Sequence, residues 1–251
     1  MTSPTAGTSG TTTPPPDATP TPTARVRPGL LAVGLLATAV AAWSVSMYAT
    51  ASLAELAADD EGLAATYVDT PPAIQAALYV HIGFAAFALA VGWPQFSTRL
   101  RRRSPALHRA LGRCYLVAVG VGAVAGAVIA PWSRAELTAV VGFGTLAVLW
   151  LTTAWRALVA IRRGDVANHR AWMMRCYALT FAGVTLRLWV GVLVNAQLAL
   201  AGPGADAAAI FDVAYAPLPF LSWLPNLLVA EWLIRRRGLP SYRIVAQPVA
   251  A

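Results

Sequence analysis

Long apolar stretches dominate the chain from residue 30 onward. Six of them, separated by polar segments, cover residues 30–51, 73–97, 106–130, 136–160, 171–199 and 214–234. Each has about the 20 residues that an α-helix needs to cross the hydrocarbon core of a bilayer. The first stretch ends in a sequence that imitates a signal-peptide cleavage site, but it is too long for the apolar region of such a peptide. The pattern therefore predicts an all-α, polytopic membrane helix bundle with six transmembrane helices.

The segments outside these stretches divide the chain into three predicted parts. Residues 1–28 are rich in Thr and Pro and have few large apolar side chains, which is typical of a disordered tail. Residues 29–237 form the predicted six-helix transmembrane domain, and residues 238–251 form a second tail. The longest connection, 52–72, is acidic and ends in two prolines, which signal the start of a helix.

Composition and charge support this topology. Hydrophobic residues make up 57% of the chain and charged residues 12%, too few charges to cover a water-soluble protein of 251 residues. All 19 basic residues are Arg: six crossings place 17 on one side, Arg134 on the other and Arg187 within the membrane. The positive-inside rule then predicts both termini in the cytoplasm of a bacterial cell, with the protein in its cytoplasmic membrane. The basic clusters stand at helix ends without interleaved aromatic residues, so nucleic acid is not a predicted partner.

The chain contains an internal repeat. The sequence HRALGRCY at 108–115 returns as HRAWMMRCY at 169–177, and with one inserted residue six positions coincide. The period of about 61 residues corresponds to one helical hairpin. The third and fourth helices are thus predicted to be a parallel repeat of the fifth and sixth.

The repeat places His108 and His169 in the first turns of two helices that run in the same direction. A helix N-terminus carries partial positive charge, and Arg109, Arg113 and Arg170 add full charges, so this level favours a bound anion. One interpretation is a site for a lipid phosphate or another small anionic ligand. The alternative is a b-type haem held by His108 and His169 that passes electrons to a quinone. The interfacial position of both residues and the presence of only three His in the chain stand against haem.

Ionisable residues inside a membrane are costly and are therefore candidates for function. Four are predicted there: His81, Arg175, Arg187 and Glu231. At a rise of about 1.5 Å per residue, Arg175 and Glu231 lie at similar depths on antiparallel helices, which predicts a structural ion pair. Arg187 lies five helical turns beyond His169 and is expected near His81 in the outer half of the bundle. These two residues either bind a ligand or belong to a structural cluster whose candidate members are Asn195, Asp212 and Tyr215.

The last apolar stretch contains Pro217, Pro219 and Pro225. Proline removes a backbone donor and disturbs the helix around it, so a kink is predicted here. Discontinuous helices of this kind also line ligand sites in transporters. The sixth helix is therefore the one whose path the sequence defines least.

A series of motifs runs through the middle of the chain. It comprises His81-x-Gly83, Gly92-x-x-Gln95-Phe96, His108-Arg109-x-x-Gly112-Arg113-x-Tyr115, Leu149-Trp150-x-Thr152, His169-Arg170-x-Trp172-Met173-x-Arg175-x-Tyr177-Ala178-Leu179-Thr180 and Arg187. Over residues 74–190 the chain resembles an uncharacterised family of bacterial multi-pass membrane proteins, the domain of unknown function 2306. The resemblance implies a membrane protein and supplies no activity, cofactor or ligand.

No enzyme class is predicted from the motifs that carry chemistry. The chain has no phosphate-binding glycine loop, zinc-protease histidine pair or nucleophile elbow, and Cys114 and Cys176 are interpreted as small apolar residues rather than metal ligands. The favoured interpretation is a non-catalytic binding or transport module that recognises a lipid or small anionic ligand. The alternative is a membrane electron-transfer protein with b-type haem or quinone. We expect His108 and His169 to face one cytoplasmic cleft, and His81 and Arg187 to line an outer pocket.

Overall fold

The computed structural model describes residues 28–58, 64–202, 204 and 206–241. Within these ranges all regular structure is helical. Five helices are long and apolar enough to cross a membrane, and a bent pair of helices is a candidate for a sixth crossing if the pair forms one span. The prediction of an all-α membrane bundle is confirmed. The tails predicted at 1–28 and 238–251, and part of the acidic connection, lie largely outside the described residues.

The long helices follow the predicted order. They are α1 (Pro28–Thr50), α4 (Pro72–Gly92), α6 (Pro105–Ile129), α7 (Glu136–Arg162), α8 (Val166–Thr180) with α9 (Ala182–Ala201), and α10 (Ala207–Tyr215), which precedes α11 (Leu218–Leu221) and α12 (Leu224–Arg236). Short helices connect them: α2 (Leu53–Ala58), α3 (Ala64–Tyr67), η1 (Trp93–Phe96), α5 (Thr98–Arg103) and η2 (Ala130–Trp132). The fifth crossing begins at residue 166, before the predicted 171, because Asp165 caps it.

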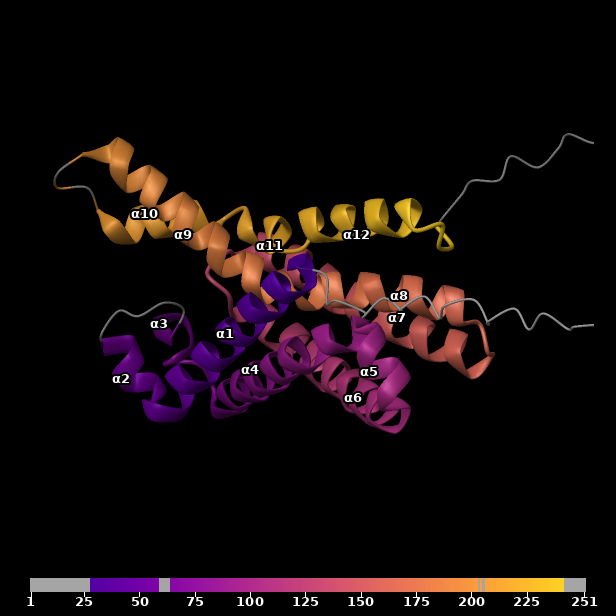
Figure 1. Ribbon diagram of the computed structural model, residues 1–251. Coiled ribbons are helices and arrows are strands. Elements are labelled where there is room, and N and C mark those ends of the chain that lie inside the picture. The colour runs from indigo at the N-terminus through magenta and orange to yellow at the C-terminus, as the bar shows by residue number, and fades with distance from the viewer. Residues whose placement is uncertain (1–27, 59–63, 203, 205, 242–251) are drawn as a thin grey trace, which may run out of the picture.

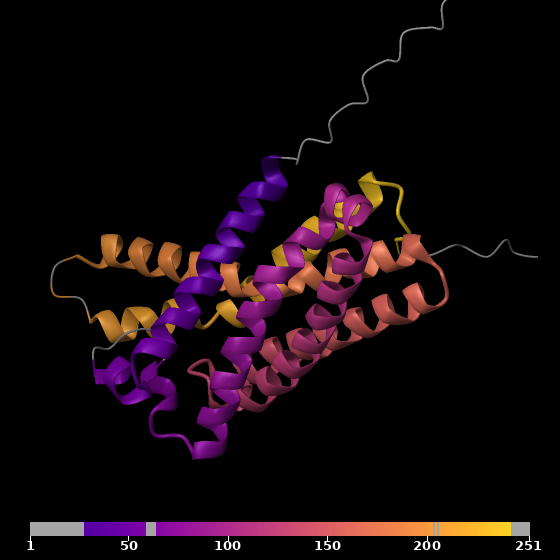
Figure 2. The ribbon, with the colours of Figure 1, turned by 60° about the horizontal axis from the view of Figure 1, so that its bottom comes forward.

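The helices pack side by side as a bundle. α4 lies against α1 and α6, α6 also lies against α7, α7 packs on α8, and α12 covers α8 (Figure 1). The hairpin of α9 and α10 extends to the left of the bundle in both views (Figures 1 and 2). The right-hand end holds α5, the α7–α8 turn and the end of α12, whereas α2 and α3 lie at the left-hand end (Figure 1).

Both tyrosines of the internal repeat pack against one glycine of α4. A methyl group added at Gly92 would lie 2.6 Å from the ring of Tyr177 and 2.8 Å from the ring of Tyr115. The Tyr177 hydroxyl also donates a hydrogen bond of 3.2 Å to the carbonyl of Leu89. Because real side-chain contacts are longer than this, only glycine permits this approach of α4 to α6 and α8. The repeated positions thus meet at one point in the core.

A buried polar network joins α6, α7 and α8 beside this contact. Thr180 Oγ1 donates to the carbonyl of Cys176 at 2.9 Å and accepts a 2.9 Å hydrogen bond from Trp150 Nε1. Its only proton is used in this way, so the Tyr115 hydroxyl, 2.7 Å away, is the donor to Thr180. Cys176 Sγ lies 3.3 Å from the same hydroxyl. The network satisfies polar groups that have no access to water.

The sixth crossing departs from the predicted helix over 214–234. α10 meets the segment containing α11 and α12 at an angle of 48°. Pro219 and Pro225 lie in the first turns of α11 and α12, where the missing N–H has no helical partner to lose. Each proline therefore begins a new helix rather than kinking one.

The break between α11 and α12 faces the break between α8 and α9. Thr185 Oγ1 donates a hydrogen bond to the carbonyl of Ser222. The amide nitrogen of Asn226 lies 3.2 Å from the carbonyl of Ala178 and 2.9 Å from Thr185 Oγ1. Side chains of each crossing thus satisfy backbone groups of the other, which makes two interrupted helices tolerable inside a membrane.

We predict that Gly92→Ala destabilises the folded protein by about 1–3 kcal/mol, because both tyrosine rings must move to admit the new methyl group. Chemical denaturation of the purified protein in detergent measures the change. Gly83→Ala on the same helix is the matched control, since a methyl group there meets no atom within 4 Å. Equal stability of the two variants would contradict the packing role of Gly92.

Candidate functional site

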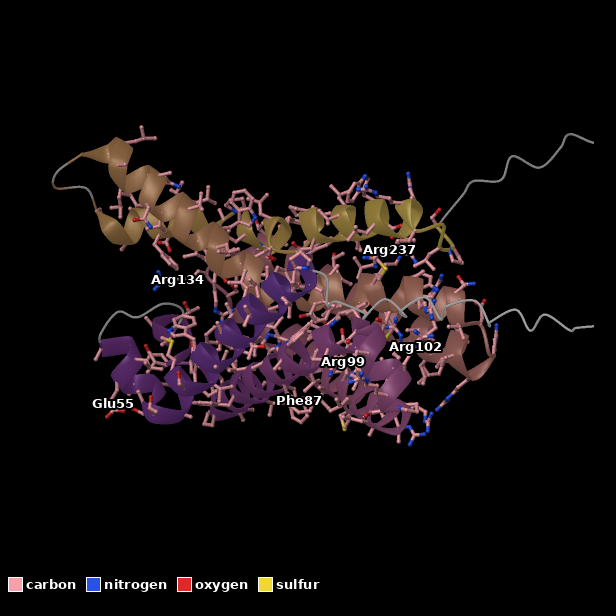
Figure 3. All side chains as sticks on the ribbon, viewed as in Figure 1. Glu55, Phe87, Arg99, Arg102, Arg134 and Arg237 are labelled. Atoms are coloured by element: carbon pink, nitrogen blue, oxygen red, sulfur yellow. The ribbon has the colours of Figure 1, made fainter. Side chains whose placement is uncertain are left out.

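Arginine side chains gather at one end of the bundle, which we call the arginine-rich end. Arg99, Arg102 and Arg237 lie toward it, whereas Glu55 and Arg134 lie toward the other end (Figure 3). It is formed by α5, the start of α6, the α7–α8 turn and the end of α12. Its members are Arg99, Arg101, Arg102, Arg103, Arg109, Arg113, Arg156, Arg162, Arg163, Arg170, Arg235, Arg236 and Arg237.

The start of α8 positions His169 at this end. The carboxylate of Asp165 accepts a 2.9 Å hydrogen bond from the backbone N–H of Asn168, and this bond lowers the pKa of Asp165. His169 Nδ1 lies 2.9 Å from the carbonyl of Ala157 on α7. Because a carbonyl only accepts, Nδ1 carries a proton, so the tautomer of a neutral ring would have its lone pair on Nε2.

His108 lies close to His169. The two rings are near enough to influence each other electrostatically, and Arg101 and Arg109 act on His108 in the same way. His108 Nδ1 is buried and has no hydrogen-bond partner. Both repeated histidines thus lie at the arginine-rich end, and a cleft shared by them stays a proposal.

Gln95 and Arg101 belong to the same group, although neither was predicted as a site residue. The Arg101 guanidinium donates a 3.0 Å hydrogen bond to the backbone carbonyl of Gln95. The Gln95 side chain reaches α6, where a methyl group added at Gly112 would lie 3.9 Å from Oε1. Gly112 is one helical turn from His108, on the same face. The signal in the sequence was a lone glutamine at the end of an apolar stretch, within the motif Gly92-x-x-Gln95-Phe96.

The side chain of Gln95 is buried and unpaired. It is 6% exposed, and both its Nε2 and its Oε1 lack a hydrogen-bond partner. With His108 Nδ1, three of the four unpaired buried side-chain atoms found in the described residues belong to this group; the fourth is Ser222 Oγ. A buried polar atom without a partner costs about 1–3 kcal/mol, so a group of three points to a ligand or water.

Positive charge surrounds this group. Burial, and then the neighbouring charge of Arg170, lower the pKa of the Arg101 guanidinium. Arg109, Arg113 and Arg170 are exposed on the helices that carry the two histidines. We name Gln95, Arg101, His108, His169 and Arg170 the inner polar group, with Arg109 and Arg113 at its edge.

His81 is held against α6 instead. Its Nδ1 lies 2.8 Å from the carbonyl of Gly122, and a methyl group at Gly126 would lie 2.9 Å from the same nitrogen. The two glycines of the Gly122-x-x-x-Gly126 motif therefore admit the imidazole between α4 and α6. No hydrogen bond joins His81 to Arg187 in the described structure, although the two act on each other electrostatically.

Arg187 finds partners other than those considered from the sequence. Its guanidinium donates a 2.7 Å hydrogen bond to the carbonyl of Gly183 and lies 5.3 Å from the centre of the Trp43 ring on α1. Asp212, one candidate, pairs with Arg134 at 3.1 Å, and Asn195 bonds the carbonyl of Gly191. Asn195 and Asp212 thus do not form the predicted structural cluster with Arg187. The predicted outer pocket lined by His81 and Arg187 stays a proposal.

Arg175 and Glu231 contact each other between α8 and α12. Arg175 Nε donates to one carboxylate oxygen of Glu231, and the second guanidinium bond, to the other oxygen, measures 2.9 Å. The Arg175 side chain is 4% exposed and that of Glu231 26%. The Arg175 guanidinium also stacks 4.6 Å from the centre of the Trp172 ring, which Arg156 approaches at 4.9 Å. This bidentate pair holds α12 onto α8.

A metal ion or a haem needs ligand side chains grouped around it. Among the described residues no three His, Cys, Asp or Glu side chains group as metal ligands. His169 donates its Nδ1–H to a backbone carbonyl, which leaves Nε2 as the nitrogen that could bind an iron. Histidines that bind a metal are usually held by such a hydrogen bond from the other ring nitrogen. One such ligand fits haem, and the pairing of His108 with it stays a proposal.

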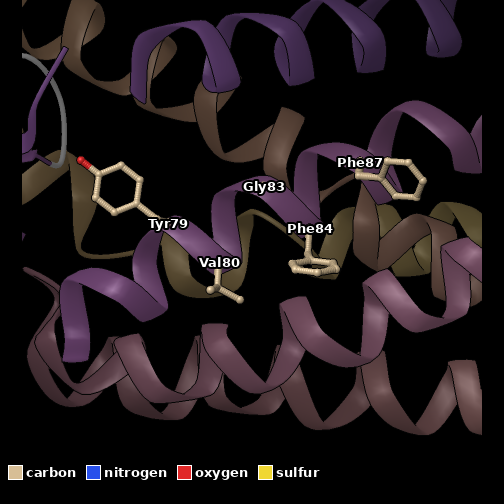
Figure 4. Close-up of a pocket in the computed structure, with 5 residues that line it drawn as sticks. All are labelled: Tyr79, Val80, Gly83, Phe84 and Phe87. Carbon is tan, nitrogen blue, oxygen red and sulfur yellow. The ribbon is translucent and has the colours of Figure 1, made fainter. Parts of the chain in front are cut away.

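A surface hollow of the described residues lies away from this group. It is a groove of about 520 Å³ on α4, lined by Tyr79, Val80, Gly83, Phe84 and Phe87 (Figure 4). Phe84 and Phe87 are exposed. No charged side chain lines the groove, which suits contact with lipid tails.

Comparison with known proteins places the chain in a family. The sequence profile described as "Predicted membrane protein (DUF2306)" matches residues 78–234, more than half of the chain. The protein therefore belongs to this family, in agreement with the resemblance in the sequence. No functionally curated protein and no solved structure matches the chain.

We predict that Glu231→Gln lowers the free energy of unfolding by about 2 kcal/mol or more, because it leaves the buried charge of Arg175 poorly compensated. The partial exposure of Glu231 keeps the loss below that of a fully buried pair. Denaturation in detergent measures the loss, and Asp69→Asn, at an exposed carboxylate, is the control. The swap of Arg175 to Glu with Glu231 to Arg should recover part of the stability; no recovery would count against direct pairing.

Proposed function

We propose that this member of the DUF2306 family is a membrane binding or transport module whose inner polar group holds an anionic group, from a lipid or a small ligand. The observation that carries the proposal is the set of three unpaired buried atoms on Gln95 and His108 next to Arg101. A site without its ligand leaves such atoms unpaired.

The charges around these atoms favour a ligand with negative charge. Arg101 and Arg170 lie close together, and Arg109 acts on His108 from the exposed face. In the described residues, Asp165 is occupied in capping α8, and Glu231 is paired with Arg175. Guanidinium groups without a nearby free carboxylate favour a phosphate or carboxylate group from outside the chain.

We propose in addition that the arginine-rich end faces the cytoplasm, with both ends of the chain on that side. The start of α1 and the end of α12 lie toward the side of the bundle that carries the arginines (Figure 1), whereas Arg134 lies toward the other end (Figure 3). Retention of arginine-rich loops in the cytoplasm then orients the protein. This orientation gives the inner polar group access to the cytoplasmic leaflet and to cytoplasmic anions.

Site-directed labelling tests the orientation. In a background without Cys114 and Cys176, single cysteines replace Ser52 and Ser241, and intact cells are treated with a membrane-impermeant maleimide. We expect labelling at position 52 and protection at position 241, since the positive-inside rule keeps the second in the cytoplasm. Labelling at 241 together with protection at 52 would overturn the proposed topology.

Lipid binding tests the anion site. Detergent-purified protein is titrated in a calorimeter with dioctanoyl phosphatidic acid and, separately, with dioctanoyl phosphatidylcholine. We expect the anionic lipid to bind more tightly, and we expect Arg101→Gln and His108→Ala to weaken it about tenfold, the loss of one charge-assisted or buried hydrogen bond.

Arg162→Gln is the matched control, because it removes the same charge from an exposed position at the same end. An equal loss in this control would show unspecific attraction, and equal binding of the two lipids would refute the anion site.

The haem alternative makes its own prediction for the same samples: a Soret absorption band that disappears in His108→Ala and in His169→Ala.

A further inference from the structure

The side-chain amide of Gln95 restricts which chemical groups can satisfy the site. Its two ends, Nε2 and Oε1, are both buried and both unpaired. An amide nitrogen donates and an amide oxygen accepts, so the site offers one unused donor group and one unused acceptor, whichever way the amide is turned. A ligand that satisfies this side chain must itself both accept and donate.

Most anionic groups of membranes only accept. An ionised carboxylate and the phosphate of a diester have oxygen acceptors and no proton. A carboxylate or a phosphodiester could accept hydrogen bonds from Nε2 of Gln95 and from Arg101. It would have no proton to donate to Oε1 of Gln95, which is itself an acceptor. Two acceptors facing each other in a buried site are both left without a partner, which costs binding energy.

A phosphomonoester meets both requirements. Its second pKa is about 6, so at about pH 6 roughly half of it carries one negative charge and one P–OH group, and at pH 7 about a tenth still does. The charged oxygens suit Arg101 and Nε2 of Gln95, and the P–OH donates to Oε1. His108 Nδ1 adds a donor or an acceptor according to its tautomer.

We propose that the ligand of the inner polar group is a monoprotonated phosphomonoester, and that Gln95 is the residue that distinguishes it from a phosphodiester. This inference rests on the proposed anion site. The monoester is either the headgroup of a lipid or a free phosphate, because the two present the same group to Gln95 and Arg101.

Three probes of the detergent-purified full chain separate these cases at about pH 6. Dioctanoyl phosphatidic acid is the lipid monoester, dioctanoyl phosphatidylmethanol is the matched diester in which a methyl group replaces the phosphate proton, and inorganic phosphate is the free form. Calorimetry gives the dissociation constant of each. We expect the monoester lipid to bind about tenfold more tightly than its methyl ester, the effect of one buried acceptor left unpaired.

The glutamine itself is tested with Gln95→Leu, which removes both the donor and the acceptor in a side chain of similar size. We expect this variant to lose the preference for the monoester while it retains Arg101 and binds both lipids weakly. Gln197→Leu, on α9 toward the hairpin with α10, is the matched control and should keep the preference. Loss of the preference in both variants would overturn the role of Gln95.

The outcomes separate the inference from the function on which it rests. Equal binding of monoester and methyl ester, both tighter than phosphatidylcholine, overturns the phosphomonoester while the anion site stands. Absence of binding by every anionic probe overturns both. Tighter binding of phosphatidic acid than of inorganic phosphate supports the inference with a lipid as the source, and equal binding of these two supports it with free phosphate as the source.

Discussion

The hydrocarbon core of a bilayer contains no water, so each buried polar group of this protein needs a partner within the chain. The two interrupted crossings show how this constraint is met. Thr185 and Asn226 bond backbone carbonyls at the breaks between α8 and α9 and between α11 and α12. Tyr115, Trp150 and Thr180 satisfy one another in the core. Helices with polar residues and prolines are tolerated here because side chains of neighbouring helices take the place of water.

The same constraint makes buried atoms without hydrogen-bond partners unusual, so they indicate where a ligand could bind. Ser222 Oγ is a single hydroxyl at a helix break, whereas Gln95 and His108 contribute three such atoms at one end of the bundle. Their position matters as much as their number, since Arg101 bonds the backbone of Gln95 and acts on His108. Unpaired atoms beside positive charge are what a site for an anion presents before the anion binds.

Arginines at and next to the arginine-rich end are stabilised in two ways. Arg175, the most deeply buried arginine of the described residues, has a carboxylate from Glu231 and the face of Trp172. Arginines at the surface, such as Arg109 and Arg113, are exposed and need no partner within the chain. Arg101 is between these cases: it is partly buried and feels the charge of Arg170, so an external anion would relieve the repulsion between them. The ion pair thus holds α12 on α8, and the region around Arg101 is the one that we propose for binding.

The apolar stretches by themselves determined the fold class and the five to six candidate crossings, because burial of about 20 residues in a bilayer depends on composition and length alone. The repeat pointed to His108 and His169, which lie near the starts of α6 and α8, and residue spacing matched the depths of Arg175 and Glu231, which form an ion pair. Only the tertiary structure showed that Gln95 is buried without a partner, that Asp212 belongs to Arg134, and that two tyrosines meet at Gly92. These facts depend on which helices are neighbours and how closely they approach, and hydrophobic periodicity carries no information about either.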